Sequence, residues 1–214
     1  MLIQRVFVDA NVLYSRTLRD WLFLLRRETE GMFQIHTTED VLAETAYRLR
    51  RSNPTMAGGV IRDLREKITS SIDELVGDYD ATIEYSGDDP NDLHVHAAAI
   101  ASEAHILLTA DQGFDGSDDD PYEVFTCDDF FILVDDSASW MVERVTANQN
   151  AYWSQKEGGR KSLSQALKDS GCPKFALRVE GHLRTLSGIG NRQTRRANAR
   201  TSSRTASEFS PLSK

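Results

Sequence analysis

The stretch "DPNDLHVHAAAIASEAHILLTAD" (residues 89–111) contains the strongest structural signal of this 214-residue chain. It opens with Asp89, a good helix-capping residue, and Pro90, a residue type favoured at the first helical position. Residues 89–104 are therefore predicted to form an alanine-rich helix, and "HILLTA" (105–110) is the most strand-like run in the chain. A helix that leads into a short apolar strand is typical of a βαβ unit, so this stretch predicts a parallel sheet.

The same alternation of strand and helix signals extends through residues 1–150. We predict further strands at 3–8, 33–37, 82–85 and 122–126, and helices at 17–27, 38–51, 57–76, 138–153 and 161–171. Residues 175–183 fit either a strand or a helix. Short strands that alternate with helices predict an α/β fold of three layers, α/β/α, with a central and mostly parallel sheet and a C-terminal extension.

The net charge divides the chain into an acidic and a basic part. Residues 1–150 contain 12 Lys and Arg against 29 Asp and Glu, a charge of −17, whereas residues 151–214 contain 13 against 4, a charge of +9. We predict an α/β domain at 1–155, a partly helical extension at 156–184 and a basic, disordered tail at 185–214. The tail is expected to contact an anionic partner such as RNA through arginines that include Arg192, Arg195 and Arg196, with a merely solvated tail as the alternative.

Composition narrows the class of protein. A hydrophobic fraction of 40% is enough to bury a core. The chain has no run of about 18 apolar residues, so no membrane span is predicted, and the N-terminus does not have the pattern of a signal peptide. The two cysteines, Cys127 and Cys172, are too few for a disulfide framework, which favours a cytoplasmic location.

Acidic residues follow predicted strands at the ends where ligands bind in parallel sheets. Asp9 ends the run "RVFVD", Asp111 ends "ILLTAD", and Asp92 lies in the first turn of helix 89–104. Glu44 lies about two turns into helix 38–51. If these elements are neighbours, the four carboxylates converge on one rim, where they repel one another unless they share a cation. All-oxygen ligands select Mg²⁺ or Mn²⁺, ions that activate water and stabilise charge at a phosphodiester.

Each of these acids also has a purely structural explanation. Asp92 can cap its helix, Glu44 can pair with Arg48 four residues later, and Asp111 can begin a turn. Asp9 is the hardest to explain in this way, because an acid directly after a buried strand has a large desolvation cost.

Two other kinds of metal site fit the sequence less well. His94 and His96 are two residues apart and point to different sides of a helix, so they do not form an i,i+4 zinc pair. The run "DGSDDDPYE" (115–123) lacks the spacing of a calcium-binding loop and is interpreted as a charged surface loop.

The chain resembles the PIN-domain nucleases, in particular the toxins of VapBC toxin–antitoxin pairs. The resemblance covers roughly residues 3–150 and rests on "VFVDANVLYS" (6–15), "DVLAE" (40–44), the stretch 89–111 and "EVFTCDDFF" (123–131). It implies that the catalytic residues are Asp9, Glu44, Asp92 and Asp111.

The same resemblance implies a metal site. Asp9, Asp92 and Asp111 are expected to bind Mg²⁺ or Mn²⁺, and Asn11 is expected to lie near the ion. Gly113 stands where the family often has a second acid, so Asp89 and Asp115 are secondary candidates.

The function implied is that of a divalent-metal-dependent endoribonuclease, the toxin of a type II toxin–antitoxin pair. Its expected partners are an RNA substrate, a cognate antitoxin and a second copy of the chain in a homodimer. Arg48 and Arg51 are expected to contact phosphates and so to offset the acidic charge. The alternative is a catalytically silent, PIN-like subunit that binds RNA or assembles a complex. A receiver-like phosphoacceptor domain is ranked last, because no lysine follows the strand 122–126.

Overall fold

The computed structural model describes residues 3–85, 87, 89–111, 114, 119–155 and 161–188. Asp115 and the tail arginines named above lie outside these residues.

A five-stranded sheet forms the centre of the molecule, and each neighbouring pair of strands runs parallel. The predicted α/β fold is therefore confirmed. The strand order is β3-β2-β1-β4-β5, so the order reverses between the central strands β1 and β4. The strands are β1 (Gln4–Val8), β2 (Phe33–Thr38), β3 (Glu74–Val76), β4 (Ile106–Thr109) and β5 (Glu123–Thr126).

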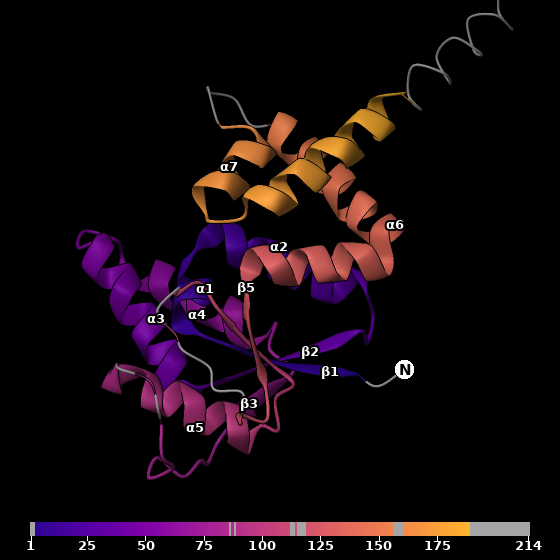
Figure 1. The fold of residues 1–214 in the computed structure, drawn as a ribbon. Coiled ribbons are helices and arrows are strands. Elements are labelled where there is room, and N and C mark those ends of the chain that lie inside the picture. The colour runs from indigo at the N-terminus through magenta and orange to yellow at the C-terminus, as the bar shows by residue number, and fades with distance from the viewer. Residues whose placement is uncertain are drawn as a thin grey trace, which may run out of the picture.

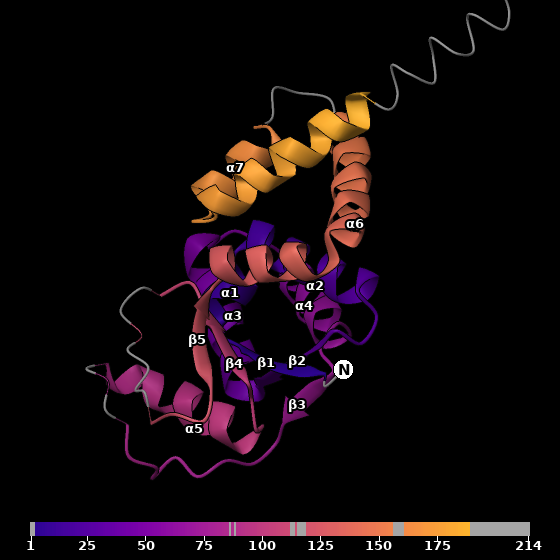
Figure 2. The same cartoon turned by 45° about the vertical axis from the view of Figure 1, so that its right-hand side comes forward.

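Helices cover both faces of the sheet, as Figures 1 and 2 show. One face carries α5 (Leu93–Ala101), and the opposite face carries α2 (Arg16–Glu28) and α6 (Cys127–Ser154). This is the predicted three-layer arrangement. The other elements in the described residues are α1 (Ala10–Tyr14), α3 (Glu39–Ser52), α4 (Gly58–Thr69), the 3₁₀ turn η1 (Pro90–Asp92), α7 (Leu163–Asp169) and a helix at 173–188.

An aromatic cluster joins the extension to the sheet. Phe175, in the helix 173–188, packs edge-on against Trp21 of α2 at 5.1 Å between ring centroids and lies 5.2 Å from Phe131 of α6. Phe33 of β2 packs on Phe130 at 5.1 Å. These side chains are at most 2% exposed, so the hydrophobic core continues without a break from β2 through α6 into the C-terminal helices.

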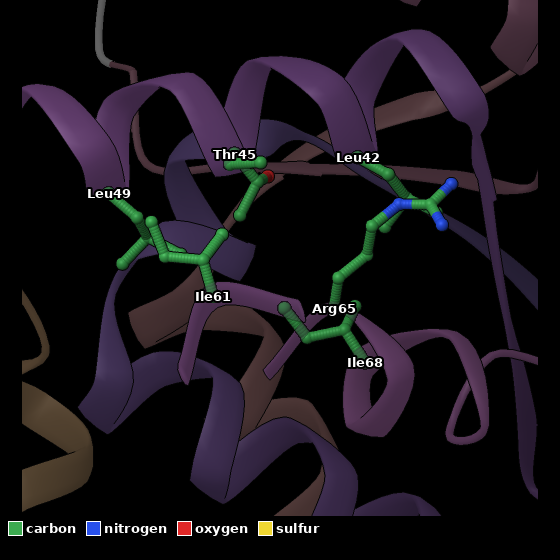
Figure 3. Close-up of a pocket in the computed structure, with 7 residues that line it drawn as sticks. Leu42, Thr45, Leu49, Ile61, Arg65 and Ile68 are labelled. Atoms are coloured by element: carbon green, nitrogen blue, oxygen red, sulfur yellow. The ribbon is translucent and has the colours of Figure 1, made fainter. Parts of the chain in front are cut away.

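The packing of α3 on α4 shows which face of α3 is turned toward another helix. Figure 3 shows Leu42, Thr45 and Leu49 of α3 pointing toward Ile61 and Ile68 of α4. The crevice between the two helices has a volume of ≈ 10 Å³, about that of one water probe, so this contact is closely packed. The opposite face of α3 is consequently turned away from α4.

The third strand is not where the sequence pattern predicts it. Residues 82–85 are irregular, because the Asp80 carboxylate accepts hydrogen bonds from the backbone N–H and hydroxyl of Thr82 at 2.9 and 2.6 Å, a local turn that competes with a strand. The predicted helix 57–76 is also longer than the observed one. α4 ends at Thr69, and the chain then turns into β3.

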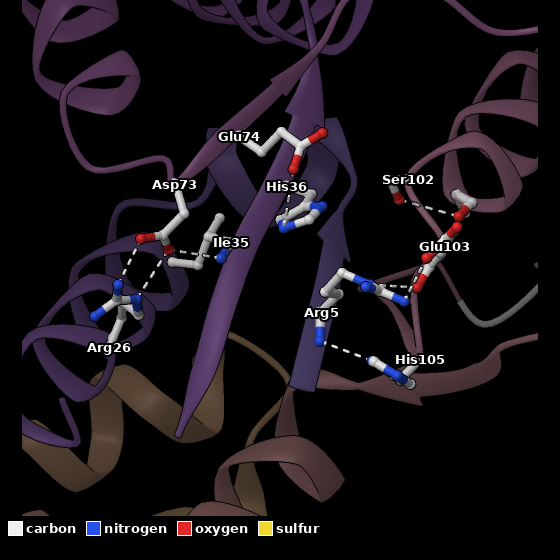
Figure 4. Close-up of polar contacts among 10 residues, drawn as sticks. Arg5, Arg26, Ile35, His36, Asp73, Glu74, Ser102, Glu103 and His105 are labelled. Carbon is white, nitrogen blue, oxygen red and sulfur yellow. Dashed lines mark hydrogen bonds and ion pairs between the residues drawn. The ribbon is translucent and has the colours of Figure 1, made fainter. Parts of the chain in front are cut away.

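Asp73 fixes that strand in place, as Figure 4 shows. Its carboxylate accepts a hydrogen bond from the backbone N–H of Ile35 on β2 and pairs with Arg26 on α2, both at 2.8 Å. Burial alone would raise the pKa of Asp73, but the hydrogen bonds from Arg26 and Ile35 outweigh it and hold the pKa below its ordinary value. Asp73 thus ties the start of β3 to β2 and α2.

The other edge of Figure 4 shows a second polar tie, at the amino ends of β1 and β4. The backbone N–H of Arg5 donates to His105 Nδ1 at 2.9 Å, and the Arg5 guanidinium contacts the carbonyl of Glu103 at 2.7 Å and its carboxylate at 2.9 Å. These contacts fix the register of the two central strands, which carry the acidic residues at their other ends.

Besides helix 57–76, the helices differ from the predictions in four places. The helix predicted at 89–104 is divided into η1 and the shorter α5, and the short helix α1 was not predicted. α6 begins at Cys127 rather than at residue 138, where Ala138 instead forms a kink with φ −147° and ψ 50°. Residues 175–183, for which a strand or a helix was predicted, lie in the helix 173–188. The same helix includes residues 185–188, which were predicted to be disordered.

No helix in the described part of the chain combines the length and apolar character that crossing a membrane requires.

Candidate active site

The predicted acidic residues line one open cavity at the carboxyl edge of the sheet. The cavity has a volume of ≈ 860 Å³ and lies where the strand order reverses, the usual ligand-binding position of an open α/β sheet. Its lining comes from four parts of the chain and includes Asp9, Asn11, Glu44, Arg48, Arg51, Asp89, Asp92 and Asp111. The structure therefore brings together all the predicted site residues that it describes.

Asp9 is the most deeply buried of these acids, with 7% exposure. It follows β1 directly and caps α1, with one carboxylate oxygen accepting from the Ala10 N–H at 2.5 Å. The other oxygen accepts from the Thr109 hydroxyl at 2.9 Å. Burial raises the pKa of Asp9, the two hydrogen bonds oppose this, and the nearby Glu44 carboxylate raises the pKa further. Asp9 is thus a buried acid surrounded by too little positive charge.

Thr109, which the sequence analysis did not single out, organises this part of the site. Besides donating to Asp9, its hydroxyl accepts hydrogen bonds from the Asn11 amide at 2.9 Å and from the backbone N–H of Asp111 at 3.0 Å. Asn11 also accepts from the backbone N–H of Ala110 at 2.8 Å. The ends of β1 and β4 are therefore connected by side chains. The only signal of this role in the sequence is the threonine two residues before Asp111.

Asp92 lines the cavity from the start of α5, the helix on the face of the sheet opposite to α2 and α6. Within the described residues 89–111 its carboxylate makes no capping hydrogen bond to that helix, so capping does not account for the acid. Burial raises the pKa of Asp92 to about 6, with added repulsion from Asp89, Asp9 and Asp111 in that order. This mutual repulsion shows that the carboxylates are close enough to act on one another.

The α3 wall of the cavity carries charge of both signs. Glu44 pairs with Arg48 at 2.6 Å, the contact that the i,i+4 spacing predicts, and both residues line the cavity. Arg51 and Ser52 continue this wall, together with Tyr47, which the sequence analysis missed. The Ser52 hydroxyl accepts a hydrogen bond from Tyr14 of α1 at 2.9 Å, so α1 and α3 are joined at the rim.

The two histidines of α5 have different surroundings. His94 lines the cavity. His96 is buried, with Nδ1 2.5 Å from the Tyr122 hydroxyl and its ring 5.1 Å from that of Tyr85. The two side chains therefore occupy separate environments, as their spacing predicts.

The donor set fits a hard divalent cation in chemistry and charge. Asp9, Asp92 and Asp111 offer carboxylate oxygens, and burial together with neighbouring carboxylates raises the pKa values of Asp9 and Asp92, a cost of ionisation that a cation would relieve. Among the described residues no group of three His, Cys, Asp or Glu side chains has the arrangement of a metal site. The acids thus share a cavity without forming a closed coordination shell.

Comparison with known proteins supports the same region. A family model described as PIN domain matches residues 5–113, just over half of the 214 residues and a range that contains Asp9, Glu44, Asp92 and Asp111. A comparison with curated proteins finds no match.

Proposed function

This chain belongs to the PIN-domain family, and from that premise we propose that it is a divalent-metal-dependent endoribonuclease. Membership of the family implies nuclease-type activity in general. The observation that carries the narrower proposal is the convergence of Asp9, Asp92 and Asp111 on one cavity, where burial and neighbouring carboxylates raise the pKa of Asp92 to about 6. Such a cluster is costly without a cation and suits one that binds phosphate.

Each acid has a role in this proposal. Asp9, Asp92 and Asp111 would hold Mg²⁺ or Mn²⁺, with Asp89 and Asn11 beside them. A bound divalent ion supplies charge stabilisation at the phosphate and acidifies water. Glu44 would either complete the ligand shell of the ion or orient the attacking water and accept its proton. As the water oxygen bonds to phosphorus, the opposite ester bond breaks and its oxygen leaves with a proton from solvent. Thr109 is a positioning residue, because it holds the Asp9 carboxylate in place.

Two arginines make an acidic cavity compatible with an anionic substrate. Arg48 and Arg51 line the cavity on α3. Phosphate contacts from guanidinium groups contribute a salt-dependent part of RNA affinity and offset the −17 charge of residues 1–150. Arg48 already lowers the pKa of Asp9 slightly, so it acts on the same group that the metal would.

The test is cleavage of labelled RNA by the full chain with Mn²⁺ or Mg²⁺, compared with a chelator. Wild type should cut only with the metal, and Asp9→Asn should lower the rate by more than about 100-fold, since even groups that only orient metal ligands contribute about 10–100-fold. Asp63→Asn, an exposed carboxylate on α4, is the matched control and should cut like wild type. Equal cleavage by Asp9→Asn and wild type would refute the assignment.

We extend the proposal to a biological role as the toxin of a type II toxin–antitoxin pair, acting as a homodimer and held inactive by an antitoxin. The support is the resemblance of the motifs around Asp9 and Asp92 to the toxin type. Expression of wild type should then arrest growth, and expression of Asp9→Asn should not. Growth at the normal rate with active enzyme present would favour a housekeeping role in RNA processing.

A catalytically silent subunit that binds RNA is the second candidate. The observation in its favour is that the described residues include no preformed group of three metal-binding side chains. Such a subunit would bind RNA with no dependence on Mn²⁺ and would leave the RNA intact.

A further inference from the structure

One face of α3 carries a row of cavity residues that includes Tyr47, a side chain to which the proposed mechanism assigns no role. Glu44, Tyr47, Arg48, Arg51 and Ser52 are spaced i, i+3, i+4, i+7 and i+8, and all line the cavity. Residues at this spacing share one side of a helix. Where a core-facing helix would have an apolar stripe, this face has a phenol ring and two guanidinium groups.

Tyr47 is the most exposed large aromatic side chain on the described part of the chain, at 63%. Its ring makes little use of the hydrophobic core, because the core-facing residues of α3 are Val41, Leu42 and Thr45. A single exposed apolar side chain is ordinary on a protein surface. An exposed ring that lines a polar cavity together with two arginines indicates which kind of ligand would bind there.

The ring is presented by a rigid support. The inner face of α3 lies against α4 through Leu42 and Leu49, which point toward Ile61 and Ile68, as Figure 3 shows. The end of α3 is fixed by the hydrogen bond from Tyr14 to Ser52, and Arg50 holds the following loop through the carbonyl of Pro54 at 3.2 Å. Groups on rigid elements lose less entropy when they bind a ligand.

The chemistry of this row matches a nucleotide better than a peptide. An aromatic ring offers a stacking face to an unpaired base, and neighbouring arginines contact the phosphates on either side of it. A base can stack in this way only when it is out of a duplex. We infer that Tyr47 stacks on a base of the RNA and is a specificity-determining residue, which makes the site selective for single-stranded over duplex RNA; this rests on the RNA substrate of the proposed function.

Binding can test this inference without cleavage. The probe is a short single-stranded RNA with one 2-aminopurine base, whose fluorescence falls when it stacks on an aromatic ring, titrated in Ca²⁺ and again in EDTA. We expect wild type and Tyr47→Phe to bind and to quench the probe. Tyr47→Ala should lose about 5- to 150-fold in affinity, the range that about 1–3 kcal/mol of base stacking gives, and should lose the quenching.

Two controls separate stacking from general effects. Trp140→Ala removes an aromatic side chain of similar exposure, 60%, on α6 outside the cavity lining, and should bind like wild type. A duplex of the same RNA should bind more weakly than the single strand and should not respond to Tyr47→Ala.

The outcomes distinguish this inference from the proposed nuclease activity. Binding and quenching that depend on Tyr47, without cleavage in Mn²⁺, would support the stacking role and refute the nuclease. If wild type cleaves RNA and Tyr47→Ala keeps its affinity and quenching, the nuclease is supported and the stacking role is overturned. The exposed ring would then be a contact for a protein partner. A wild-type protein that binds no RNA in either buffer would overturn the stacking role as well.

Discussion

The aspartates at the start of α6 and those of the cavity are the same residue type in opposite electrostatic surroundings. On α6, Asp129 pairs with Lys174 at 2.7 Å, Asp136 pairs with Arg178 at 2.8 Å, and the buried Asp135 lies 2.8 Å from His182 Nε2. Hydrogen bonds from Lys174 and Thr126 lower the pKa of Asp129 below its ordinary value. In the cavity, burial and neighbouring carboxylates raise the pKa of Asp92 to about 6.

This difference separates structural acids from candidate catalytic ones. The acids of α6 hold the helix 173–188 against the body, and Asp128 supplies both carboxylate oxygens to the backbone N–H groups of Lys174 and Phe175 at the start of that helix. Each negative charge there is met by a cation or by N–H groups of the helix terminus. In the cavity, burial and neighbouring carboxylates raise the pKa values of Asp9 and Asp92, an arrangement that suits the cation we propose.

The largest expected effect on stability comes from the docked region. Phe175→Ala removes a fully buried ring that packs against Trp21 and Phe131, and we expect it to lower the free energy of unfolding by about 3–5 kcal/mol. Urea unfolding measures this loss. Leu177→Ala, on the same helix with 62% exposure, is the matched control and should change stability by less than about 0.5 kcal/mol. A wild-type transition in Phe175→Ala would show that the extension is not part of the cooperative core.

Metal binding should stabilise the cavity side by a somewhat smaller amount. At a Mn²⁺ concentration about 100 times its dissociation constant, the gain is about 2.7 kcal/mol, which raises the Tm of a chain of this size by about 5–10 °C. Thermal unfolding with Mn²⁺ and with EDTA measures the shift. Asp92→Asn should lose most of it, and Asp63→Asn should keep it. If the wild-type Tm does not respond to Mn²⁺, the silent subunit becomes the better description.

The smallest expected effects compare one aspartate from each region directly. Asp128→Asn should destabilise the metal-free protein by about 1–2 kcal/mol at neutral pH, because an amide oxygen replaces a carboxylate that accepts two helix N–H groups. Asp92→Asn should have the opposite sign and be more stable than wild type above about pH 7.

The pH dependence follows from the raised pKa of Asp92, about 6 in the folded protein. At Asp92 the folded state binds more protons than the unfolded state between the two pKa values, so the contribution of this group to stability falls as the pH rises from about 4 to about 7. Burial lowers the pKa of His36, whose contribution changes in the opposite direction. Asp92→Asn lacks the Asp92 contribution, so in EDTA its stability relative to wild type should increase as the pH rises through this range. Parallel curves for the two proteins would contradict the assigned repulsion.

The sequence could predict those parts of the fold and site that depend on local pattern. Asp9 and Asp111 were placed correctly because each directly follows an apolar run, and parallel strands end at the same edge of a sheet. The short strand β3 was not predicted, because its three residues pair only with β2 and are held by Asp73, whose partners lie 38 and 47 residues away. Thr109 and Tyr47 were missed because neither residue type signals a site alone.

Local spacing, hydrophobic periodicity and the charge of each segment were thus determined by the amino-acid sequence itself, and they were enough to identify a parallel α/β fold with acids at its carboxyl edge. The tertiary structure alone decided which aspartates pair with Lys or Arg side chains on another element and which lie where burial and neighbouring carboxylates raise their pKa. The physical reason is that periodicity acts within one helix or strand, whereas electrostatic pairing depends on distances between elements that only packing brings together.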